Sequence, residues 1–597
     1  MVERHNGTVK ECLRAYCSDH KDCDRHIPEI AFAMRTAESV VTGYTPASLC
    51  YGRELRTPWE QPGSKDDTEP PVTASHAFAA EVTRWRRYRF SLFKELGIPG
   101  PEPSLISGNL SELTRKGEIA AFEEWIPKYG DIIGFYNGAT PILIVKDLDL
   151  IKNIQIQDFS NFHDRGIVSK FAREHQLSKL SLLNALGDDW KDMRRILIPA
   201  FASSKVKKLT TLMNQCCDDF LDVLSSLHGD ENTLEIRDFF RKLALDIMMG
   251  SSFGIQSNAQ KTGEMMGVNL IATELINHLN FLVNGWESYL VECFPELTFL
   301  WKCVFWFKRH FMKLPINKIN ELLMPIINIR RSQPLSVDQD FLQLLLNAEA
   351  EDDRATNTHT KKGDNDNTRY LENKTSLRKT RLLTNVEIQC NVISFLVDGV
   401  ETASTAMTFM AYLLAKHPDI QDKVRSEASA TLEKDGEFNS GNITSLRYMD
   451  QVISEALRVY PPITGFVTRT CEKDYDWNGL KIPAGMSIKI PVYQLHHDRN
   501  LWHEPEKFDP ERFSDDNKGN IVPMAYQAYG NGTHNCIGMR FAQLELKLML
   551  AKLLANYKLL LDEKRMKENP FELDSSSIFC YPRKGVWLKL QKISSVL

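Results

Sequence analysis

The stretch Tyr529-Gly-Asn-Gly-Thr-His-Asn-Cys-Ile-Gly-Met-Arg-Phe-Ala542 places a single cysteine, Cys536, in a glycine-rich loop. The loop leads directly into a segment in which Phe541, Leu544 and Leu548 recur at helical spacing. A helix is therefore expected to begin just after the cysteine. This order of loop, cysteine and helix is the most informative pattern in the sequence.

Glycine lies on both sides of the cysteine, at Gly530, Gly532 and Gly538. Glycine permits tight turns and lets the backbone approach a flat ligand closely. A thiolate at the N-terminal end of a helix is favoured by the partial positive charge of that end. The loop can therefore present the sulfur of Cys536 to an iron porphyrin while its amides soften the charge of the thiolate. The alternative is a buried structural cysteine.

The stretch resembles the cysteine-ligand loop of the cytochrome P-450 superfamily, whose pattern is Phe-x-x-Gly-x-Arg-x-Cys-x-Gly. The resemblance implies that Cys536 is the axial ligand of the haem iron and that Gly530 and Gly538 shape the binding loop. Tyr529 replaces the usual phenylalanine and adds a hydroxyl that needs a partner if it is buried. His534 replaces an arginine that pairs with a haem propionate. An imidazole does so well only when protonated, which predicts weaker and more pH-sensitive haem binding.

A second motif lies in a long predicted helix. The capping box Thr384-Asn-Val-Glu387 marks its start, and it is expected to end near Lys416. In its middle, Asp398-Gly-Val-Glu-Thr-Ala-Ser404 resembles the oxygen-activation motif of the family, Ala-Gly-x-Asp/Glu-Thr-Thr/Ser. The resemblance implies that the glycine lets the helix open locally for dioxygen and water. It also implies that Thr402 and Glu401 deliver the protons that allow O–O cleavage.

Asp398 departs from the small residue that the family usually has at this position. It precedes Thr402 by four residues, so both lie on one helix face, which should be directed at the haem. In the fatty-acid ω-hydroxylase branch, a glutamate at the matching position is ester-linked to a haem methyl. We therefore hypothesise that Asp398 forms such an ester or binds a polar group of the substrate. A carboxylate paired with a cation is the plainer alternative.

Six further residues match family motifs. Glu455 and Arg458, at i and i+3 on a predicted helix, together with Arg512 from Phe508-Asp-Pro-Glu-Arg-Phe513, match a buried structural triad behind the cysteine loop. Trp190 and Arg194 match Trp-x-x-x-Arg, and Arg469 matches a second propionate-binding arginine. With histidine at 534, Arg194 and Arg469 are expected to carry most of the charge that faces the propionates.

The resemblance predicts a mainly α fold with small β-sheets, in one large haem domain over residues 76–597. Residues 351–382 are polar and charged, which predicts a disordered insert. Residues 1–60 resemble a C-terminal fragment of a retrotransposon integrase core. In that family Glu3 would be the third metal-binding carboxylate, and its two partners would lie upstream, so the fragment is expected to be non-functional. Residues 61–75 are interpreted as a linker.

Composition restricts the partners and the compartment. A net charge of −5 argues against nucleic-acid binding, and twelve cysteines without a CxxC pair indicate a reducing compartment. The sequence contains no apolar run long enough to span a bilayer. Residues 84–90 and 280–313 combine aromatic and basic residues, which suits a membrane interface as well as it suits core packing. We expect a location at the cytosolic face of the endoplasmic reticulum membrane, with the integrase-like fragment in place of the anchor helix of relatives.

The resemblance implies a haem-thiolate monooxygenase that contains haem b. Electrons would come from NADPH through a separate reductase, with cytochrome b5 as a further donor, because the chain has no flavin or nicotinamide fingerprint. The motifs are most similar to the broad-specificity drug- and steroid-oxidising branch and to thromboxane synthase, so the expected substrate is a small lipophilic xenobiotic, steroid or fatty acid. Two alternatives stay open, a reductase-independent peroxide isomerase and a non-catalytic haem-binding fusion product.

Overall fold

The computed structural model divides the chain into two compact units, Met1–Leu92 and Phe93–Leu597. The integrase-like fragment predicted at 1–60 lies outside the described residues, as do residues 61–73 of the predicted linker and nearly all of the insert predicted at 351–382. Of the first unit, only residues 74–92 are described. They belong to the helix α4 (Ala74–Glu95), which contains the basic aromatic segment. The described residues are 74–166, 180–226, 233–261, 286–297, 300–332 apart from 302, 305 and 308–314, 340–348, 382–575 and 578–593.

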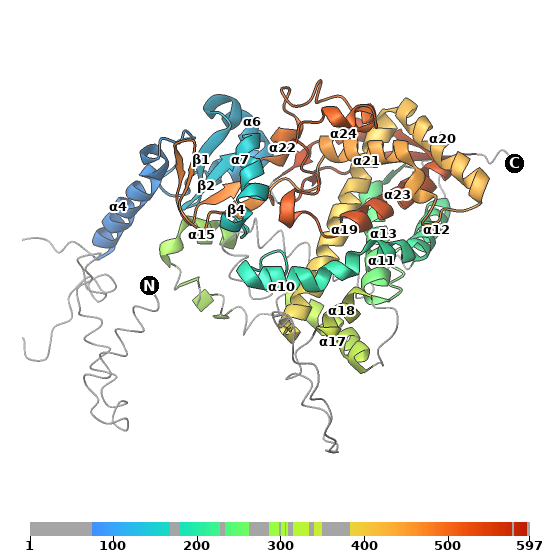
Figure 1. The fold of residues 1–597 in the computed structure, drawn as a ribbon, viewed down its shortest axis with the longest axis horizontal. Helices are drawn as coiled ribbons and strands as arrows, with labels where there is room; N and C mark the ends of the chain where they lie inside the picture. The colour runs from blue at the N-terminus through green and yellow to red at the C-terminus, as the bar shows by residue number, and fades with distance from the viewer. Residues whose placement is uncertain are drawn as a thin grey trace, which may run out of the picture. The chain divides into compact units, whose positions relative to one another are not determined.

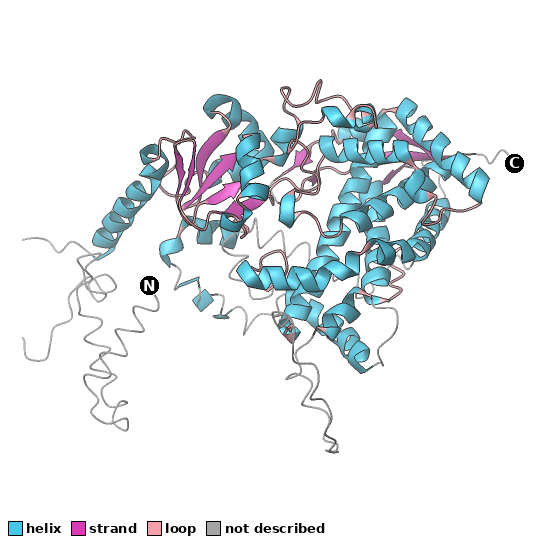
Figure 2. Ribbon diagram, in the orientation of Figure 1, coloured by secondary structure: helices cyan, strands magenta, loops and turns pink. Residues whose placement is uncertain are grey.

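The second unit is mainly helical with small sheets, which confirms the predicted fold class (Figure 2). No helix among the described residues has both the length and the apolarity needed to span a membrane. The described α-helices of the second unit are α5 (Leu110–Lys116), α6 (Glu118–Tyr129), α7 (Leu148–Lys152), α10 (Gly187–Leu197), α11 (Ser203–Lys208), α12 (Thr210–Ser226), α13 (Ile236–Phe253), α15 (Trp286–Cys293), α17 (Pro315–Ser332), α18 (Phe341–Asn347), α19 (Asn385–Lys416), α20 (Pro418–Asp435), α21 (Arg447–Val459), α22 (Val492–His496), α23 (Met539–Asn556) and α24 (Glu563–Glu568).

The largest sheet has four strands in the order β1-β2-β7-β4. The pairs β1–β2 and β4–β7 are antiparallel, whereas β2 and β7 are parallel and come from segments more than 340 positions apart. A second sheet has the order β3-β11-β8, and β5–β6 and β9–β10 are isolated pairs. The strands are β1 (Ile132–Asn137), β2 (Thr140–Val145), β3 (Thr233–Glu235), β4 (Thr468–Thr470), β5 (Tyr475–Trp477), β6 (Leu480–Ile482), β7 (Ser487–Lys489), β8 (Tyr557–Leu561), β9 (Leu573–Asp574), β10 (Tyr581–Pro582) and β11 (Trp587–Lys592).

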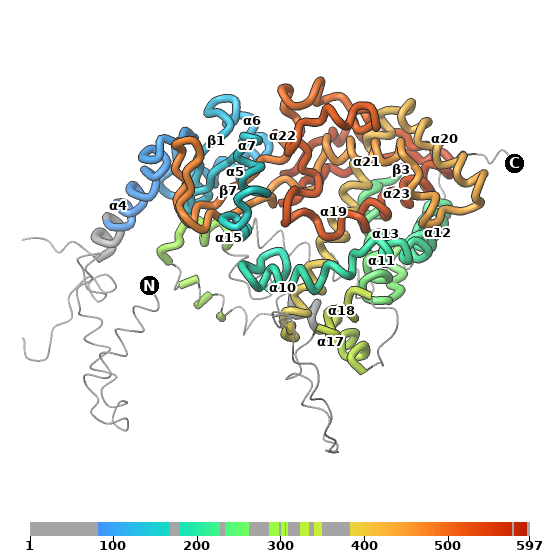
Figure 3. The backbone as a smooth tube through the Cα atoms, viewed as in Figure 1, coloured from blue at the N-terminus to red at the C-terminus, as the bar shows by residue number. Residues whose placement is uncertain are grey.

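The long helix α19 runs through the helical part of the second unit, where α13 and α23 pack against it (Figures 1 and 3). It begins after Thr384, whose side chain accepts a hydrogen bond from the Glu387 amide while the Glu387 carboxylate accepts one from the Thr384 amide. This capping box satisfies two of the amides that a helix start leaves unpaired. The helix ends at Lys416, as predicted. Most of its residues are buried, so its position is set by packing on several sides.

The helix α19 is continuous through Gly399 in this structure, and the local opening that this glycine is expected to allow for dioxygen and water stays a prediction. A Cβ atom built at Gly399 would lie 2.5 Å from Sδ of Met248, on α13. Real Cβ atoms essentially never approach a neighbour so closely. Gly399 therefore allows α13 and α19 to pack closely together, and the thioether of Met248 fills the space beside it.

Candidate functional site

The loop before α23 is shaped by two glycines with left-handed backbone angles, Gly530 (φ +67°) and Gly532 (φ +68°). A Cβ atom at Gly532 would lie 2.1 Å from the backbone oxygen of Gln155, so only glycine fits there. The amide of Cys536 donates a hydrogen bond to the carbonyl oxygen of Tyr529 at 2.8 Å, which closes the loop. The first helical residue, Met539, follows three positions after the cysteine.

The thiol of Cys536 is exposed, yet it is closely surrounded by protein atoms. Burial raises its pKa, and the backbone amide of Gly538 lowers it by donating a hydrogen bond to the sulfur. Asp398 raises this pKa further, whereas Arg194 and Arg165 lower it. The Gly538 amide therefore acts on the sulfur as expected, but burial has the larger effect on this pKa.

His534 is an uncharged ring in this structure. Its Nε2–H donates to the carbonyl oxygen of His163 at 2.6 Å, and its ring stacks on Trp190 with 3.9 Å between centroids. Burial, together with the positive charges of Arg469 and Arg165, lowers the pKa of His534 to about 2. The pH-sensitive propionate contact predicted for His534 would need an imidazolium, which these surroundings disfavour.

Trp190 and Arg194 lie on one face of α10, four residues apart. The guanidinium of Arg194 is 5.7 Å from the ring centroid of Trp190. Its Nη2 donates to both the backbone oxygen (3.0 Å) and the side-chain oxygen (2.8 Å) of Asn535, the residue before the cysteine. These two hydrogen bonds hold Arg194 against the loop. They use Nη2, so the other terminal nitrogen, Nη1, has no part in them.

Arg469, on β4, is 2% exposed, and its Nη1 donates to the carbonyl oxygen of Thr468 at 2.7 Å. Its Nε is buried and makes no hydrogen bond to the described residues. Burial and the nearby charge of Arg165 lower the pKa of Arg469 to about 9. A cation with a buried donor and a cationic neighbour is suited to an anionic ligand.

Sequence reasoning missed Arg165. Burial and the charge of Arg194 lower its pKa to about 10, so three arginines act on one another beside the loop. The one available signal was the loss of an arginine at 534, which could have prompted a search for a replacement cation.

Asp398 and Thr402 lie on the side of α19 that acts on Cys536. Asp398 is half-buried, and burial raises its pKa to about 7, an effect that the positive charge of Arg165 opposes. The hydroxyl of Thr402 donates to the Asp398 carbonyl oxygen at 2.5 Å, one helical turn back. Of the side chains expected to face the iron, Asp398 acts electrostatically on the thiol of Cys536.

Glu401 is not joined to Thr402. Its carboxylate is 3% exposed and forms ion pairs with two arginines of α13, Arg237 at 3.2 Å and Arg241 at 3.0 Å. Arg237 also lies 4.5 Å from the ring centroid of Tyr581. Sequence reasoning missed both arginines, although their spacing of four residues on one helix was visible.

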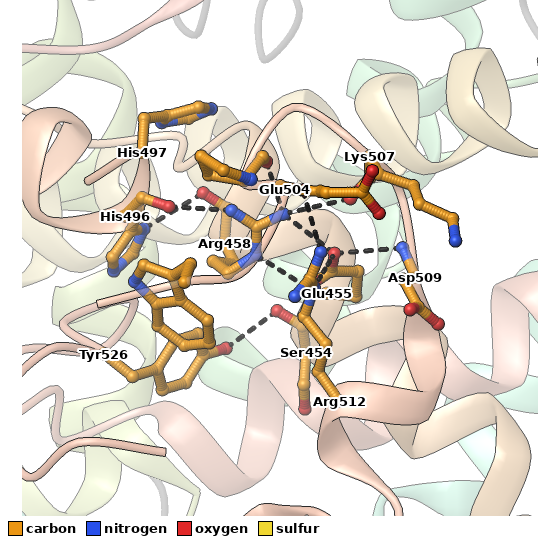
Figure 4. A network of polar contacts seen from close by, with 12 residues as sticks. Ser454, Glu455, Arg458, His496, His497, Glu504, Lys507, Asp509, Arg512 and Tyr526 are labelled. Carbon is orange, nitrogen blue, oxygen red and sulfur yellow. Dashed lines mark hydrogen bonds and ion pairs between the residues drawn. The ribbon is translucent and has the colours of Figure 1, made fainter. Parts of the chain in front are cut away.

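The residues Glu455, Arg458 and Arg512 are brought together (Figure 4). Arg458 binds Glu455 through Nε (2.7 Å) and Nη2 (2.8 Å), and both side chains are fully buried. Arg512 Nε and the amide of Asp509 donate to the same carboxylate at 3.3 and 3.0 Å. Arg458 also donates to the carbonyl oxygen of His496 at 2.7 Å. The carboxylate is thus fully satisfied, which is what makes a buried ion pair tolerable.

The residues around Cys536 fit a haem. The thiol of Cys536 can ligate iron, and the arginines beside it can hold two carboxylates. Buried polar atoms that lack a hydrogen bond to the described residues include Nε of Arg469, Nδ1 of His534 and the hydroxyl of Tyr529. For Tyr529, the partner predicted for its hydroxyl is thus not provided by these residues. The set of one soft sulfur ligand and several cations suits an anionic porphyrin.

Comparison with known proteins agrees with this geometry. Residues 98–589 match the family model described as cytochrome P-450. Cytochrome P-450 3A9 of Rattus norvegicus is 32% identical over 476 residues, which are 78% of this chain and 86% of the relative. Cytochrome P-450 3A31 of Mesocricetus auratus is 29% identical over 518 residues, 84% of this chain and 93% of the relative. Cytochrome P-450 3A12 of Canis lupus familiaris is 30% identical over 514 residues, with coverage of 84% and 93%.

Proposed function

Because this chain belongs to the cytochrome P-450 family of haem-thiolate monooxygenases, we propose that it inserts one oxygen atom from O2 into a small lipophilic molecule such as a xenobiotic, steroid or fatty acid. The haem b of this family supplies, when bound, a thiolate-ligated iron that favours O–O cleavage. The observation that carries the proposal is the thiol of Cys536 in its glycine-shaped loop, within electrostatic reach of Asp398 on α19. Electrons would come from NADPH through a separate reductase.

Different residues of the chain have different roles in the proposed reaction. Cys536 binds the iron, and the amide of Gly538 donates to its sulfur. The Thr402 hydroxyl donates a hydrogen bond to the Asp398 carbonyl oxygen. The oxygen of the same hydroxyl can still accept a hydrogen bond from another donor. Thr402 can therefore pass a proton toward the reacting oxygen and regain one from solvent or a neighbour.

A proton from Glu401 requires a movement of this side chain. Its carboxylate must leave Arg237 and Arg241 before it can reach the face of α19 that carries Thr402. The ion pairs would thus hold Glu401 away between turnovers. We expect Arg241→Gln to change the pH dependence of turnover more than substrate binding, because one of the two restraints is removed.

Asp398 is proposed to bind a polar group of the substrate. With a pKa near 7, its carboxyl can donate or accept a hydrogen bond at neutral pH. Such a contact would select substrates with a hydroxyl, carbonyl or amine at a fixed distance from the oxidised carbon. The ester to a haem methyl is the competing role. Haem that stays with the protein during acid–acetone extraction would establish the ester, and complete extraction would exclude it.

We place the protein at the cytosolic face of the endoplasmic reticulum membrane, with cytochrome b5 as a second electron donor. Trp286, Trp306 and Phe307, from the aromatic segment, have exposed side chains, which supports contact with a membrane surface more than packing in a core. Co-sedimentation with phosphatidylcholine vesicles tests this contact. The triple substitution of these residues by serine should reduce the bound fraction, and an unchanged fraction would contradict the assignment.

The reduced, carbon-monoxide-bound absorption spectrum tests the function first. We expect a strongly red-shifted Soret band that is lost in Cys536→Ala. Product formation should then require both NADPH and reductase, and Thr402→Ala should uncouple NADPH consumption from product. A band typical of a non-thiolate ligand in the wild-type chain, even at high pH, would leave the non-catalytic haem binder as the better description.

The pairing of Glu401 with two arginines favours one second candidate, the rearrangement of a lipid peroxide, because that reaction needs no proton delivered to oxygen. The same preparation distinguishes the two. Turnover of a fatty-acid hydroperoxide without NADPH and reductase, and none of a C–H substrate with them, would support the isomerase.

A further inference from the structure

Two buried glutamines join the cysteine loop to the segment that follows α7. Gln155 and Gln527 are 0% and 2% exposed, and each side-chain amide donates to the side-chain oxygen of the other, at 3.3 and 3.2 Å. Because each amide acts as donor and acceptor at once, the pair fixes the orientation of both side chains as well as their distance. The two residues are 372 positions apart in the sequence, and Gln527 lies two residues before Tyr529, where the loop begins.

Gln155 belongs to a π-helical turn, η1 (Asn153–Gln157), which continues α7. The amide of Asp158 donates to the Asn153 carbonyl oxygen at 2.8 Å, and this bond spans five residues instead of the four of an α-helix. The carbonyl oxygen of Gln155 occupies the space beside Gly532, where a Cβ atom would lie 2.1 Å from it. The turn therefore contacts the loop through its backbone and through the side chain of Gln155. Single π-turns of this kind are frequent at functional sites.

Gln527 is bound through its backbone as well. Its amide donates to Nε2 of His496 at 2.8 Å, and its carbonyl oxygen accepts the amide of Gly530 at 2.9 Å. His496 in turn bonds through Nδ1 to the carbonyl oxygen of Arg458, in the buried ion-pair cluster (Figure 4). Gly530 is one of the two glycines with left-handed backbone angles that shape the loop. The position of Gln527 therefore sets where the loop turns.

The side chain of Gln527 also restrains a strained residue. Met524 has φ +68°, a backbone angle that a residue with a long side chain rarely adopts. The carbonyl oxygen of Met524 accepts a hydrogen bond from Nε2 of Gln527 at 2.9 Å, so the amide that binds Gln155 also holds this conformation. Strain of this kind persists only where the surrounding contacts enforce it, and it concentrates at functional sites.

We propose that Gln155 and Gln527 are a pair of positioning residues, which hold the cysteine loop in the place where Cys536 can ligate the haem iron. Gln527 fixes the turn at Gly530, and the neighbouring carbonyl oxygen of Tyr529 accepts the amide of Cys536. Loss of either amide leaves the other buried without this partner, and a shift of the loop relieves that cost. The pair acts on the thiol only through the backbone. The proposal rests on the thiolate ligation proposed above and is independent of the substrate.

The persistence of the thiolate-ligated form tests this role. We expect the red-shifted Soret band of the reduced, carbon-monoxide-bound holoprotein to convert about tenfold faster into the band of a non-thiolate ligand in Gln155→Leu, and likewise in Gln527→Leu. Gln421→Leu is the matched control. Gln421 is also 0% exposed, and its Nε2 donates to the carbonyl oxygens of Leu414 and Leu559, outside the loop. This variant should be less stable in urea, but without denaturant its band should convert at the wild-type rate.

The double variant Gln155→Leu/Gln527→Leu separates positioning from stability, and it decides the question even if a single variant yields no holoprotein. Neither amide is left unpaired in it, so its free energy of unfolding should be close to that of the wild type. Its red-shifted band should still convert faster, because two apolar side chains do not fix an orientation as paired amides do.

A wild-type conversion rate in the double variant, or in both single variants, would overturn the assignment. The first result would show that filling the space between η1 and the loop is sufficient. A wild-type chain that never forms the red-shifted band would instead count against the proposed function, so the two failures are distinguishable.

Discussion

The imidazole of His534 stacks on the indole of Trp190, with 3.9 Å between the ring centroids and 27° between the ring planes. At this position the family pattern has an arginine, whose charge would face the haem propionates. Here the ring packs as a neutral aromatic group, with its N–H bound to the His163 carbonyl oxygen. The loop is therefore held by stacking and by one backbone hydrogen bond, and the charge comes from other residues.

His496 should make the protein sensitive to acid. Its Nδ1–H donates to the Arg458 carbonyl oxygen at 3.0 Å, and its Nε2 accepts the Gln527 amide at 2.8 Å. The second contact requires the neutral ring, because a protonated Nε2 cannot accept a hydrogen bond, and burial keeps the pKa of His496 well below its usual value. Below pH ~6.5 the imidazole of His496 therefore binds a proton in the unfolded chain but not in the folded chain. The contribution of His496 to the free energy of unfolding is fully present above this pH and falls as the pH decreases.

We expect the contribution of His496 to be lost at up to about 1.4 kcal/mol per pH unit below pH ~6.5. Urea unfolding of the wild type and of His496→Gln at pH 7.5, 6.5 and 5.5 measures it. The variant should be less stable at pH 7.5 but should lose less stability toward pH 5.5. Equal pH slopes in the two proteins would contradict this assignment.

Tyr529→Phe should stabilise the protein. The Tyr529 hydroxyl is buried without a hydrogen bond to the described residues, and burial raises its pKa well above the usual value. Removing an unsatisfied hydroxyl should increase the free energy of unfolding by about 1 kcal/mol. Tyr526→Phe is the matched control, because the Tyr526 hydroxyl donates to the Ser454 carbonyl oxygen at 3.1 Å and its loss should destabilise. Destabilisation by both changes would show that Tyr529 has a partner.

Gly399→Ala should destabilise the packing of α13 on α19. The new methyl group would meet Met248 Sδ, which is flexible enough to move part of the way. We expect a loss of about 1 kcal/mol in the free energy of unfolding, at the lower end of overpacking costs. In the double variant with Met248→Ala the two costs should be less than additive, as urea unfolding would show. Strict additivity would mean that the two residues do not compete for space.

Glu455→Gln should be severely destabilising, because it leaves the fully buried guanidinium of Arg458 without its counter-charge. Breaking one side of a buried pair costs about 3–5 kcal/mol, so we expect little folded holoprotein. The yield of haem-containing protein and its unfolding midpoint measure the effect. Glu506→Gln is the control, since the Arg499–Glu506 pair is largely exposed and its loss should not change either quantity. A stable Glu455→Gln protein would remove the triad from the structural core.

Local patterns in the sequence were sufficient for the elements that carry the site. The capping box at Thr384 and Glu387 predicts where α19 starts, and the glycines around Cys536 predict the loop and the helix after it. These features depend on hydrogen bonds and backbone angles within a few residues, so the local sequence encodes them. The spacing of Glu455 and Arg458 is local in the same way.

The charge state of the site was decided by tertiary structure. His534 and the carbonyl oxygen that it binds are 371 positions apart, and Arg237 and Glu401 are 164 apart. A pKa and an ion pair depend on how densely distant segments surround a group and which charges they bring. The sequence by itself therefore determined the family and the helices around Cys536, the predicted thiol ligand. Only the tertiary structure decided that His534 is neutral, that Glu401 is paired with α13 and that Arg165 joins the site.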